Sequence, residues 1–300
     1  MELLSLRGVT KSFGRIDAVK ELDLRVGGGS IYGLLGPNGA GKTTTIRMIM
    51  DILAPDRGEI LILGRPNSSS IRDRVGYLPE ERGLYRKMKV EPLLHFLAEL
   101  KGMKREAARE RIGYWLERFA LSAWRAKKVE ELSRGMQQKL QFIATLLHSP
   151  QLAILDEPFT GLDPVNINLV KEVMLEEKKK GVSIILSTHL MEQAEKLCDQ
   201  ICLISEGEKV LDGNLKEIKA NYGKNSIVLE YEGQARFLSD KEMVESYDDY
   251  GRWVEVHPSA GVDPQEILRR AAQEVAILKF ELVEPSLNEI FIKTVRKGER

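Results

Sequence analysis

Hydrophobic positions in the first two thirds of the chain predict strands that alternate with helices. The first thirty residues predict short strands and turns. The apolar run IYGLLG then ends at Gly36, and TTTIRMIMDIL follows it with apolar residues at helical spacing from Ile46 to Leu53. Further along, QLAILDEP and GVSIILSTH are short apolar runs typical of buried strands, with the helix-like VNINLVKEVMLEEKKK between them. This order of strand, helix and strand predicts a parallel α/β sheet.

Two helical stripes interrupt this pattern between about residues 90 and 130. Leu93, Leu94, Leu97 and Leu100 form one stripe, and residues 112, 115, 116 and 119 (Ile, Trp, Leu and Phe) form the other. The sequence therefore predicts a helical insert over about residues 82–135, between two parts that are richer in strands.

The pattern changes again at about Asn221. SIVLEYEG and GRWVEVHP alternate like half-exposed strands, and AILKFELV predicts another strand. DPQEILRRAAQ carries Pro near the start of a predicted helix, and EPSLNEIFIKTV predicts a last amphipathic helix. We expect a small α+β domain over residues 221–300, joined to a first domain of residues 1–220 by the polar linker KEIKANYGKNS.

Composition narrows the class of protein. The 300 residues suffice for one large domain or two ordinary ones, and 45 basic residues balance 45 acidic ones. Overall charge therefore gives no argument for nucleic-acid binding. No apolar run approaches the ~18–20 residues of a membrane-spanning helix, and the N-terminus does not have the pattern of a secretory signal. The sequence predicts a cytosolic protein, in which Cys198 and Cys202 are small buried side chains rather than a metal pair.

The segment that begins at Gly36 has the spacing of a phosphate-binding loop. It reads G-x-x-x-x-G-K-T, with Gly41, Lys42 and Thr43 completing the motif. Glycine lets the backbone wrap a phosphate with its N–H groups inward, and the next helix presents free N–H groups to the same anion. Lys42 can reach the β- and γ-phosphates and the Thr43 hydroxyl can coordinate Mg²⁺. The alternative is an ordinary glycine turn.

A second acidic site follows the apolar run at residues 152–155. Asp156 fits a metal partner at the carboxyl end of a buried strand, acting through water, and Glu157 is placed to orient or deprotonate an attacking water. The alternative is a polar cap on the strand end. Two adjacent carboxylates at this position favour the metal and the catalytic roles.

The stretch ELSRGMQQKLQFIATLLHSPQLAILDEPFTGLDP resembles the ATP-binding subunit of ABC transporters. LSRGMQQ is similar to the signature sequence of that family, TGLD (residues 160–163) to its D-loop, and His189 in ILSTH to its switch histidine. The resemblance covers about residues 3–220 and keeps the order of the family's motifs. It implies an α/β fold in which a P-loop NTPase core with a parallel sheet carries the helical insert, followed by the small α+β C-terminal domain.

The resemblance also implies roles for individual residues. Glu157 and His189 are the expected catalytic residues, and His189 contacts the γ-phosphate and the catalytic water. Phe13, in KSFG, matches the aromatic that stacks on adenine; the alternative is an ordinary core phenylalanine. The other residues expected to bind ATP lie in the phosphate loop, the signature and the D-loop: Gly36, Pro37, Asn38, Gly39, Ala40, Gly41, Lys42, Thr43, Thr44, Ser133, Gly135 and Asp163.

The sequence departs from the family pattern at three places. Arg134 and Met136 replace the first Gly and the Gln of the signature L-S-G-G-Q, while Ser133 and Gly135 remain. Glu80, in VGYLPEERGLY, stands where the family has a Gln that contacts Mg²⁺. The expected metal set is therefore Thr43, Asp156 and Glu80, and the alternative is that Glu80 turns towards Arg82 or a docked subunit. The C-terminal 80 residues lie outside the shared core.

The resemblance implies an ATP-hydrolysing subunit that uses ATP and Mg²⁺ to power a membrane transporter, most similar to bacterial exporters of the sodium-efflux and multidrug type. Ser133 and Gly135 imply a dimer, since in the family they bind the γ-phosphate of ATP held by a second ATP-binding subunit. The other implied partner is an integral membrane permease, docked near residues 80–100, with the chain peripheral on the inner face of the membrane and no nucleic acid bound.

Two other functions are weighed against this one. The first is a soluble ABC-type ATPase acting on ribosomes or DNA, but such proteins usually carry two cores in one chain or long coiled-coil arms, whereas this chain has one core and no sustained heptads. The second is a nucleotide-binding module without catalysis. Glu157 and His189 argue against it, because both chemical positions are filled.

Overall fold

The computed structural model describes residues 2–66, 69–81, 83–222, 226–259 and 261–298. The chain divides into two compact units, Met1–Gly213 and Asn214–Arg300. The division comes before the expected linker, because α8 (Leu215–Tyr222) forms a helix there. Within the second unit, the Lys219 ammonium of α8 lies 3.9 Å from the Glu284 carboxylate.

The first unit begins with an antiparallel sheet in the order β2-β1-β4-β5. Its strands are β1 (Glu2–Phe13), β2 (Ile16–Gly27), β4 (Arg57–Ile62) and β5 (Arg65–Pro66). β1 and β2 are 12 residues each, longer than the short strands that the sequence predicts. The register between them shifts several times, as between Leu6 and Val9. Bulges of this kind break the period-two alternation by which a long strand is recognised.

The second sheet of this unit has six strands in the order β10-β9-β3-β8-β7-β6. They are β3 (Ile31–Leu35), β6 (Val75–Leu78), β7 (Leu152–Asp156), β8 (Ser183–Thr188), β9 (Gln200–Ser205) and β10 (Glu208–Asn214). The pairs from β9 to β6 are parallel, and every residue of β3, β7 and β8 is buried. The predicted parallel α/β sheet is confirmed, and the carboxyl ends of its strands share one edge.

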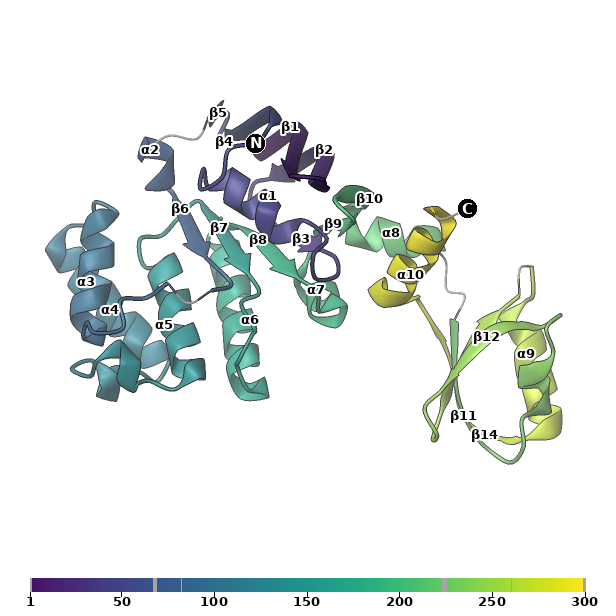
Figure 1. Cartoon of the computed structure of the whole chain (residues 1–300). Coiled ribbons are helices and arrows are strands. Elements are labelled where there is room, and N and C mark those ends of the chain that lie inside the picture. The colour runs from purple at the N-terminus through teal and green to yellow at the C-terminus, as the bar shows by residue number, and fades with distance from the viewer. Residues whose placement is uncertain (1, 67–68, 82, 223–225, 260, 299–300) are drawn as a thin grey trace. The chain divides into compact units, whose positions relative to one another are not determined.

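Helix α1 (Lys42–Ile49) packs into a core that joins the two sheets (Figure 1). Ile46 and Ile49 share that core with Leu6 of β1 and Ile185 of β8. The sequence predicts that this helix continues to residue 53. It ends earlier because Asp51 takes a left-handed backbone conformation, with a φ of 57°. The strands are further connected by α2 (Ser69–Arg72), α6 (Pro164–Lys179) and α7 (Met191–Leu197).

The predicted helical insert forms a cluster of helices at one end of the first unit (Figure 1). It contains α3 (Val90–Leu100), α4 (Arg105–Arg118), η1 (Ser122–Trp124) and η2 (Val129–Glu131), and α5 (Arg134–Leu146) returns from it to β7. The stripe on α4 is buried as predicted. On α3, Leu93 and Leu94 are buried, whereas Leu100 is 61% exposed, so this stripe is only partly covered within the chain.

The second unit is a small α+β domain, as predicted. Its antiparallel sheet has the order β12-β13-β11-β14. Its elements after α8 are β11 (Ser226–Glu232), η3 (Arg236–Ser239), β12 (Val244–Asp249), β13 (Val254–Pro258), α9 (Pro264–Glu274), β14 (Ala276–Val283) and α10 (Leu287–Gly298). Sequence analysis missed β12, because only Val244 of this edge strand is buried and little alternation remains.

Both cysteines are free and buried, in agreement with the sequence. Among the helices of the described ranges, none has the length and apolar character needed to cross a membrane.

Ile185 tests how much the parallel sheet contributes to stability. It is 1% exposed in the centre of β8, so Ile185→Ala should lower the free energy of unfolding of the first unit by about 2–5 kcal/mol. Ile52 is 62% exposed, and Ile52→Ala should change it by less than about 0.5 kcal/mol. Urea titration in a Trp253→Phe background reports this unit through Trp115 and Trp124. Equal effects of the two substitutions would contradict the packing described.

Candidate active site

The loop between β3 and α1 can be formed only because glycines stand at two of its positions. A Cβ atom on Gly36 would lie 2.1 Å from the carbonyl oxygen of Ile204, and one on Gly41 would lie 2.3 Å from that of Ala18. Both glycines also have positive φ angles, 154° and 106°. Gly41 caps α1 without a side-chain hydrogen bond, so the first N–H groups of the helix remain available to an anion.

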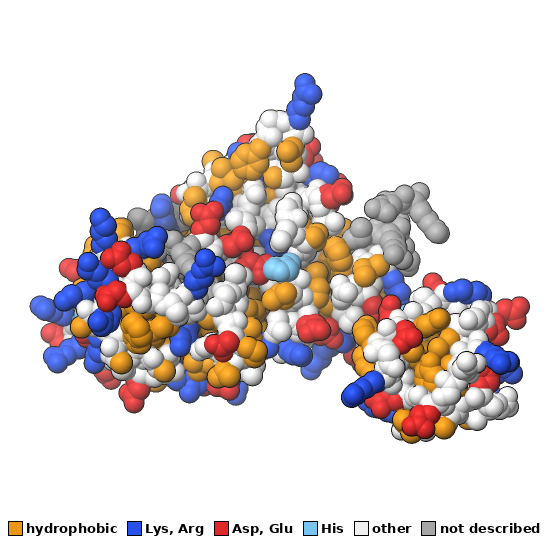
Figure 2. Space-filling model, turned by 60° about the horizontal axis from the view of Figure 1, so that its bottom comes forward, with side chains coloured by type: hydrophobic (Ala, Val, Ile, Leu, Met, Phe, Trp, Pro, Cys, Tyr) orange, Lys and Arg blue, Asp and Glu red, His pale blue; other side chains and the backbone are white. Residues whose placement is uncertain are grey.

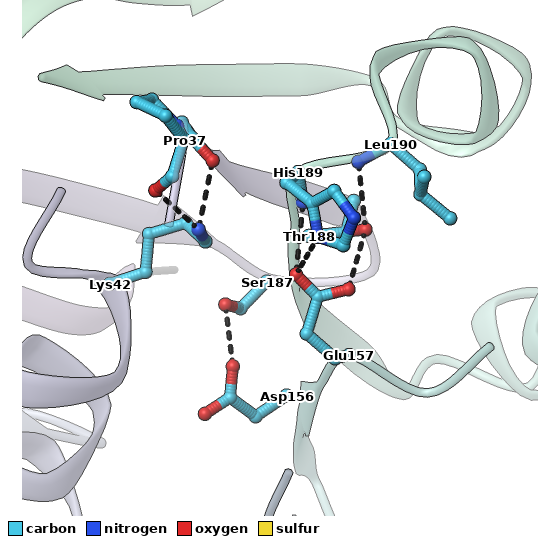
Figure 3. A network of polar contacts seen from close by, with 9 residues as sticks. Pro37, Lys42, Asp156, Glu157, Ser187, Thr188, His189 and Leu190 are labelled. Carbon is cyan, nitrogen blue, oxygen red and sulfur yellow. Dashed lines mark hydrogen bonds and ion pairs between the residues drawn. The ribbon is translucent and has the colours of Figure 1, made fainter. Parts of the chain in front are cut away.

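Lys42 is the first residue of α1 and is buried, with a relative exposure of 6%. Its Nζ donates hydrogen bonds to the carbonyl oxygens of Gly36, at 2.8 Å, and Pro37, at 3.0 Å (Figure 3). Burial lowers the pKa of Lys42, and the negative charges of Glu157, Asp156 and Glu80 oppose that effect. The ammonium group is thus held by neutral carbonyls near several carboxylates. A phosphate, which carries more negative charge than a carbonyl, can replace these carbonyls as its partner.

The predicted phosphate loop and two of the predicted acidic residues line one depression of the surface. Its lining residues are Ala18, Asn38, Gly39, Gly41, Lys42, Thr43, Thr44, Glu80 and Glu157. Segments that are more than a hundred residues apart in the sequence meet here, because β3, β6 and β7 end at the same edge of the sheet.

Asp156, at the end of β7, is fully buried behind this depression. Its Oδ1 accepts a hydrogen bond of 2.7 Å from the Ser187 hydroxyl, while its Oδ2 has no hydrogen-bond partner among the described residues. Burial raises the pKa of Asp156, although the hydroxyls of Ser187 and Thr43 lower it. A buried carboxylate oxygen without a partner is costly. Together with Thr43 and Glu80, it offers the oxygen ligands that Mg²⁺ prefers, so these residues fit that ion.

Glu157 has both carboxylate oxygens engaged by the end of β8 (Figure 3). Oε1 accepts hydrogen bonds from the backbone N–H of His189, at 3.0 Å, and from its Nδ1, at 2.7 Å; Oε2 accepts one of 3.0 Å from the Thr188 hydroxyl. An ionised carboxylate only accepts, so Nδ1 of His189 carries the proton. The side chain of Glu157 is 7% exposed and that of His189 43%. The two predicted catalytic residues are therefore in direct contact at the rim of the depression.

Glu80 follows β6 after Pro79 and is exposed at the same depression. Its charge opposes the lowering of the pKa of Lys42 and adds to the raised pKa of Asp156, which places its carboxylate near both. The alternative partner in the sequence, Arg82, lies outside the described residues.

The predicted signature and D-loop residues do not line the depression of their own chain. Ser133 is exposed and caps α5, where its hydroxyl accepts a 3.3 Å hydrogen bond from the N–H of Met136. Asp163 caps α6 in the same way, with the N–H of Asn166 at 3.0 Å. A Cβ atom on Gly135 would lie 3.2 Å from the carbonyl oxygen of Gly161, so the signature packs against the D-loop.

Helix α5 also supports two of the loops that line the depression. The side-chain amide of Gln138 donates to the carbonyl oxygen of Pro158, at 3.2 Å, next to Glu157. That of Gln141 donates to the carbonyl oxygens of Pro79, at 3.2 Å, and Glu81, at 3.3 Å, on either side of Glu80. Helix α5, which begins with the signature, is thus hydrogen-bonded to the segments that carry Glu157 and Glu80.

Phe13 lies at the end of β1 and is 51% exposed, with the Lys11 ammonium 5.8 Å from its ring. The alternative of a core phenylalanine is therefore wrong. Its ring is exposed and can contact a flat ligand.

Sequence analysis missed Ser187 and Thr188, which hold the carboxylates of Asp156 and Glu157. A signal was present, because both are polar residues at the end of an apolar strand, immediately before His189. They lie opposite the acidic pair because β7 and β8 are neighbours, with Asp156 in register with Ser187.

Comparisons with known proteins agree with this geometry. The ABC transporter family profile matches residues 19–160, and the profile of the C-terminal domain of ATP-binding proteins like DrrA1-3 matches residues 213–295. The chain is 47% identical over 293 residues to the ABC transporter ATP-binding protein YhaQ of Bacillus subtilis (strain 168), covering 98% of both chains. It is 33% identical over 305 residues to the Nod factor export ATP-binding protein I of Rhizobium sp. (strain N33), covering 99% of this chain and 98% of that one. A solved ATP-binding subunit of an ABC transporter superimposes with a TM-score of 0.70 and 32% identity, over 74% of this chain and 93% of that one.

The negative charge of Asp156 should destabilise the folded protein in the absence of nucleotide. Because burial raises its pKa in the folded state, Asp156→Asn should raise the Tm by about 2–4 °C at pH 8. The unfolded chain keeps the ordinary pKa, so the wild type takes up a proton as the pH falls through the raised folded value. The difference between the two Tm values should then shrink, as followed by differential scanning fluorimetry without nucleotide.

Asp163→Asn is the matched control. Hydrogen bonds donated by Asn166 lower the pKa of Asp163, so its charge is favourable in the folded chain and its removal should not raise the Tm. A lower Tm for Asp156→Asn at pH 8 would contradict the cost assigned to the buried charge.

Proposed function

This chain belongs to the ABC transporter family as an ATP-binding subunit that hydrolyses ATP, and we propose that it powers an exporter. The observation that carries the proposal is the meeting, at one sheet edge, of the Lys42 loop, the buried Asp156 and the Glu157–His189 pair. Similarity to Nod factor export ATP-binding proteins supports the direction of transport.

We assign the phosphates of ATP to the loop and the first turn of α1, where Lys42 exchanges two carbonyl partners for phosphate oxygens. Thr43, Asp156 and Glu80 are the residues that would hold Mg²⁺, with Asp156 acting through water. When bound, that ion neutralises charge on the phosphates. The exposed ring of Phe13 is assigned to adenine.

Glu157 is assigned to orient or deprotonate the attacking water. In the free chain its oxygens accept from His189 and Thr188, so a water competes with these donors for the carboxylate. His189 can turn its exposed ring towards the γ-phosphate, which would remove one of the two hydrogen bonds on Oε1 of Glu157 and leave the one from the backbone N–H of His189. The movement of one imidazole would then both contact the phosphate and open one acceptor position on the base to water.

The complete site is proposed to need a second copy of the chain. Ser133 and the signature backbone lie outside the depression of their own chain, at the exposed start of α5. A helix start of this kind suits the γ-phosphate of ATP held by a partner. A homodimer supplies two such sites.

The permease is proposed to dock in a groove between the parallel sheet and the helical insert. Its lining residues are Met50, Val75, Tyr77, Pro79, Gly83, Leu84, Leu97, Leu100, Lys101, Gln141, Ala144, Thr145 and His148. Beside it, the rings of Tyr85 and Phe96 meet edge to face at 5.8 Å while remaining exposed. Exposed apolar surface of this kind marks an interaction site, and a helix of an integral membrane permease would hold the chain on the inner face of the membrane.

An ATPase that acts on ribosomes or DNA is the weaker candidate. Figure 2 shows Lys and Arg side chains intermixed with Asp and Glu side chains over the first unit, without a continuous basic stripe on the face in view. Affinity purification of the tagged chain from detergent-extracted native membranes separates the two functions. A co-purifying polytopic membrane protein supports the transporter, and co-purifying ribosomes or DNA would overturn it.

Glu157→Gln tests the assigned base. Removing its charge should lower the ATP hydrolysis rate by about 10²- to 10⁴-fold while ATP still binds, because the phosphate loop is untouched. Closed subunits should then accumulate as an ATP-bound dimer, visible by size-exclusion chromatography with MgATP. Glu172→Gln, at an exposed position of α6, is the control and should hydrolyse ATP normally. Wild-type turnover by Glu157→Gln would remove this residue from the mechanism.

Glu80→Gln tests the assigned metal ligand. The substitution keeps the shape of the side chain and removes its charge, so the Mg²⁺ dependence of hydrolysis by the isolated subunit should shift to higher concentration. The adjacent Glu81 is the matched control, because its carboxylate pairs with Arg47 at 3.7 Å. An unchanged Mg²⁺ titration for Glu80→Gln, with loss of activity only in the assembled transporter, would instead indicate a coupling residue.

A further inference from the structure

The second unit carries a cluster of metal-ligating side chains on the sheet face opposite its core. On β13, Val254 and Val256 are buried in the core, so the alternating residues Glu255 and His257 belong to the other face. Glu289, near the start of α10, meets them there. One carboxylate oxygen of each glutamate and one ring nitrogen of His257 all lie within 4.8 Å of one another.

The orientation of Glu289 is fixed by the start of its own helix. Its Oε1 accepts hydrogen bonds from the backbone N–H and the hydroxyl of Ser286, at 3.2 and 2.8 Å, and the Ser286 hydroxyl accepts from the Glu289 N–H. This reciprocal cap leaves Oε2 for the cluster. Oε2 lies 3.7 Å from Nδ1 of His257 and 3.4 Å from the Ser226 hydroxyl.

His257 is held as a metal-ligating histidine is held. Its side chain is only 9% exposed, and its Nε2 lies 3.3 Å from the Asp248 carboxylate on the neighbouring strand β12. A carboxylate behind one ring nitrogen fixes the proton there and leaves the other nitrogen as a donor of electrons. Here that nitrogen is Nδ1, which faces Glu289 and lies 3.1 Å from the Ser226 hydroxyl.

The charges of the cluster do not balance among the described residues. Glu255, Glu289 and Asp248 surround one imidazole, and in the described ranges neither glutamate forms an ion pair with a lysine or arginine. Two partly buried carboxylates side by side repel each other, and a cation between them removes that repulsion.

We propose that Glu255, His257 and Glu289 bind a divalent transition-metal ion of the Zn²⁺ class, with Asp248 orienting the histidine. The imidazole nitrogen favours such an ion over Mg²⁺ or Ca²⁺, which take oxygen ligands. Bonds of about 2.0–2.2 Å require the three donor atoms to approach one another by about 1 Å. Because its Ser286 contacts hold Glu289, rotation of the Glu255 side chain would provide most of this approach. The ion would join β13 to α10 and hold the last helix on the sheet.

The test is metal binding to the full chain without nucleotide. The protein is dialysed against EDTA and then metal-free buffer, in a His189→Ala background that removes the imidazole of the ATP site. Calorimetry with Zn²⁺ and visible absorption with Co²⁺ should each show one equivalent per chain. Glu255→Gln and Glu289→Gln should each weaken binding by at least about tenfold, and Asp248→Asn by about 10- to 100-fold.

Glu281→Gln is the matched control, because this glutamate lies on β14 of the same unit and pairs with Lys279 at 2.7 Å. It should leave metal affinity unchanged. Circular dichroism identifies any variant that fails to fold, and the glutamate variants, which change no side-chain volume, decide the result if His257→Ala is unstable. The proposal would be overturned if the parent chain showed no saturable binding, or if both glutamate variants bound the metal as tightly as the parent chain.

Discussion

The proposed active site depends on keeping one ammonium group and several carboxylates close together in a partly dry place. Coulomb forces between them are strong because little water intervenes, and each group would be costly to bury alone. Lys42 is held by the carbonyls of Gly36 and Pro37, Asp156 by Ser187, and Glu157 by Thr188 and His189. These partners come together where the parallel strands β3, β7 and β8, which are buried along their whole length, end side by side.

Glu157 shows how this arrangement restrains the chemistry. Its backbone has a φ of 48°, a left-handed conformation that is unfavourable for a residue with a Cβ atom. Its N–H nevertheless donates a 2.9 Å hydrogen bond to the carbonyl oxygen of Ser187, and its side chain bonds to the next two residues of the same segment. The neighbouring strand end thus holds both halves of the residue and fixes the carboxylate beside the phosphate loop.

Much of this site could be predicted from the sequence, because its chemistry depends on short motifs that follow apolar strands. The phosphate loop, the acidic pair and His189 each stand at a strand end, and the shared edge of a parallel sheet brings such ends together. The partners of the acidic pair depend on which strands are neighbours, so Ser187 and Thr188 required the structure. The proposed metal-binding cluster of the second unit could not be predicted either, since its residues come from β13 and α10 and no motif links them.

Strand lengths and boundaries were predicted less well, for similar physical reasons. Bulges interrupt the alternation of apolar and polar residues in β1 and β2, and β12 shows little alternation because it is exposed on both faces. The polar segment KEIKANYGKNS was expected to be a linker, but most of it forms α8 within the second unit, where Ile218 and the preceding Leu215 are buried and give the helix an apolar side. A mostly polar stretch can therefore form a helix when its few apolar residues are buried.

The bonds of α5 have a consequence for communication in the proposed dimer. The start of this helix would touch the nucleotide of the partner, while Gln138 and Gln141 hold the loops that carry Glu157 and Glu80 beside its own nucleotide. A shift of the helix at one site would therefore displace catalytic groups at the other. The two sites would be coupled through one rigid helix. By thermodynamic linkage, the occupancy of each site would change the nucleotide affinity of the other by the same factor.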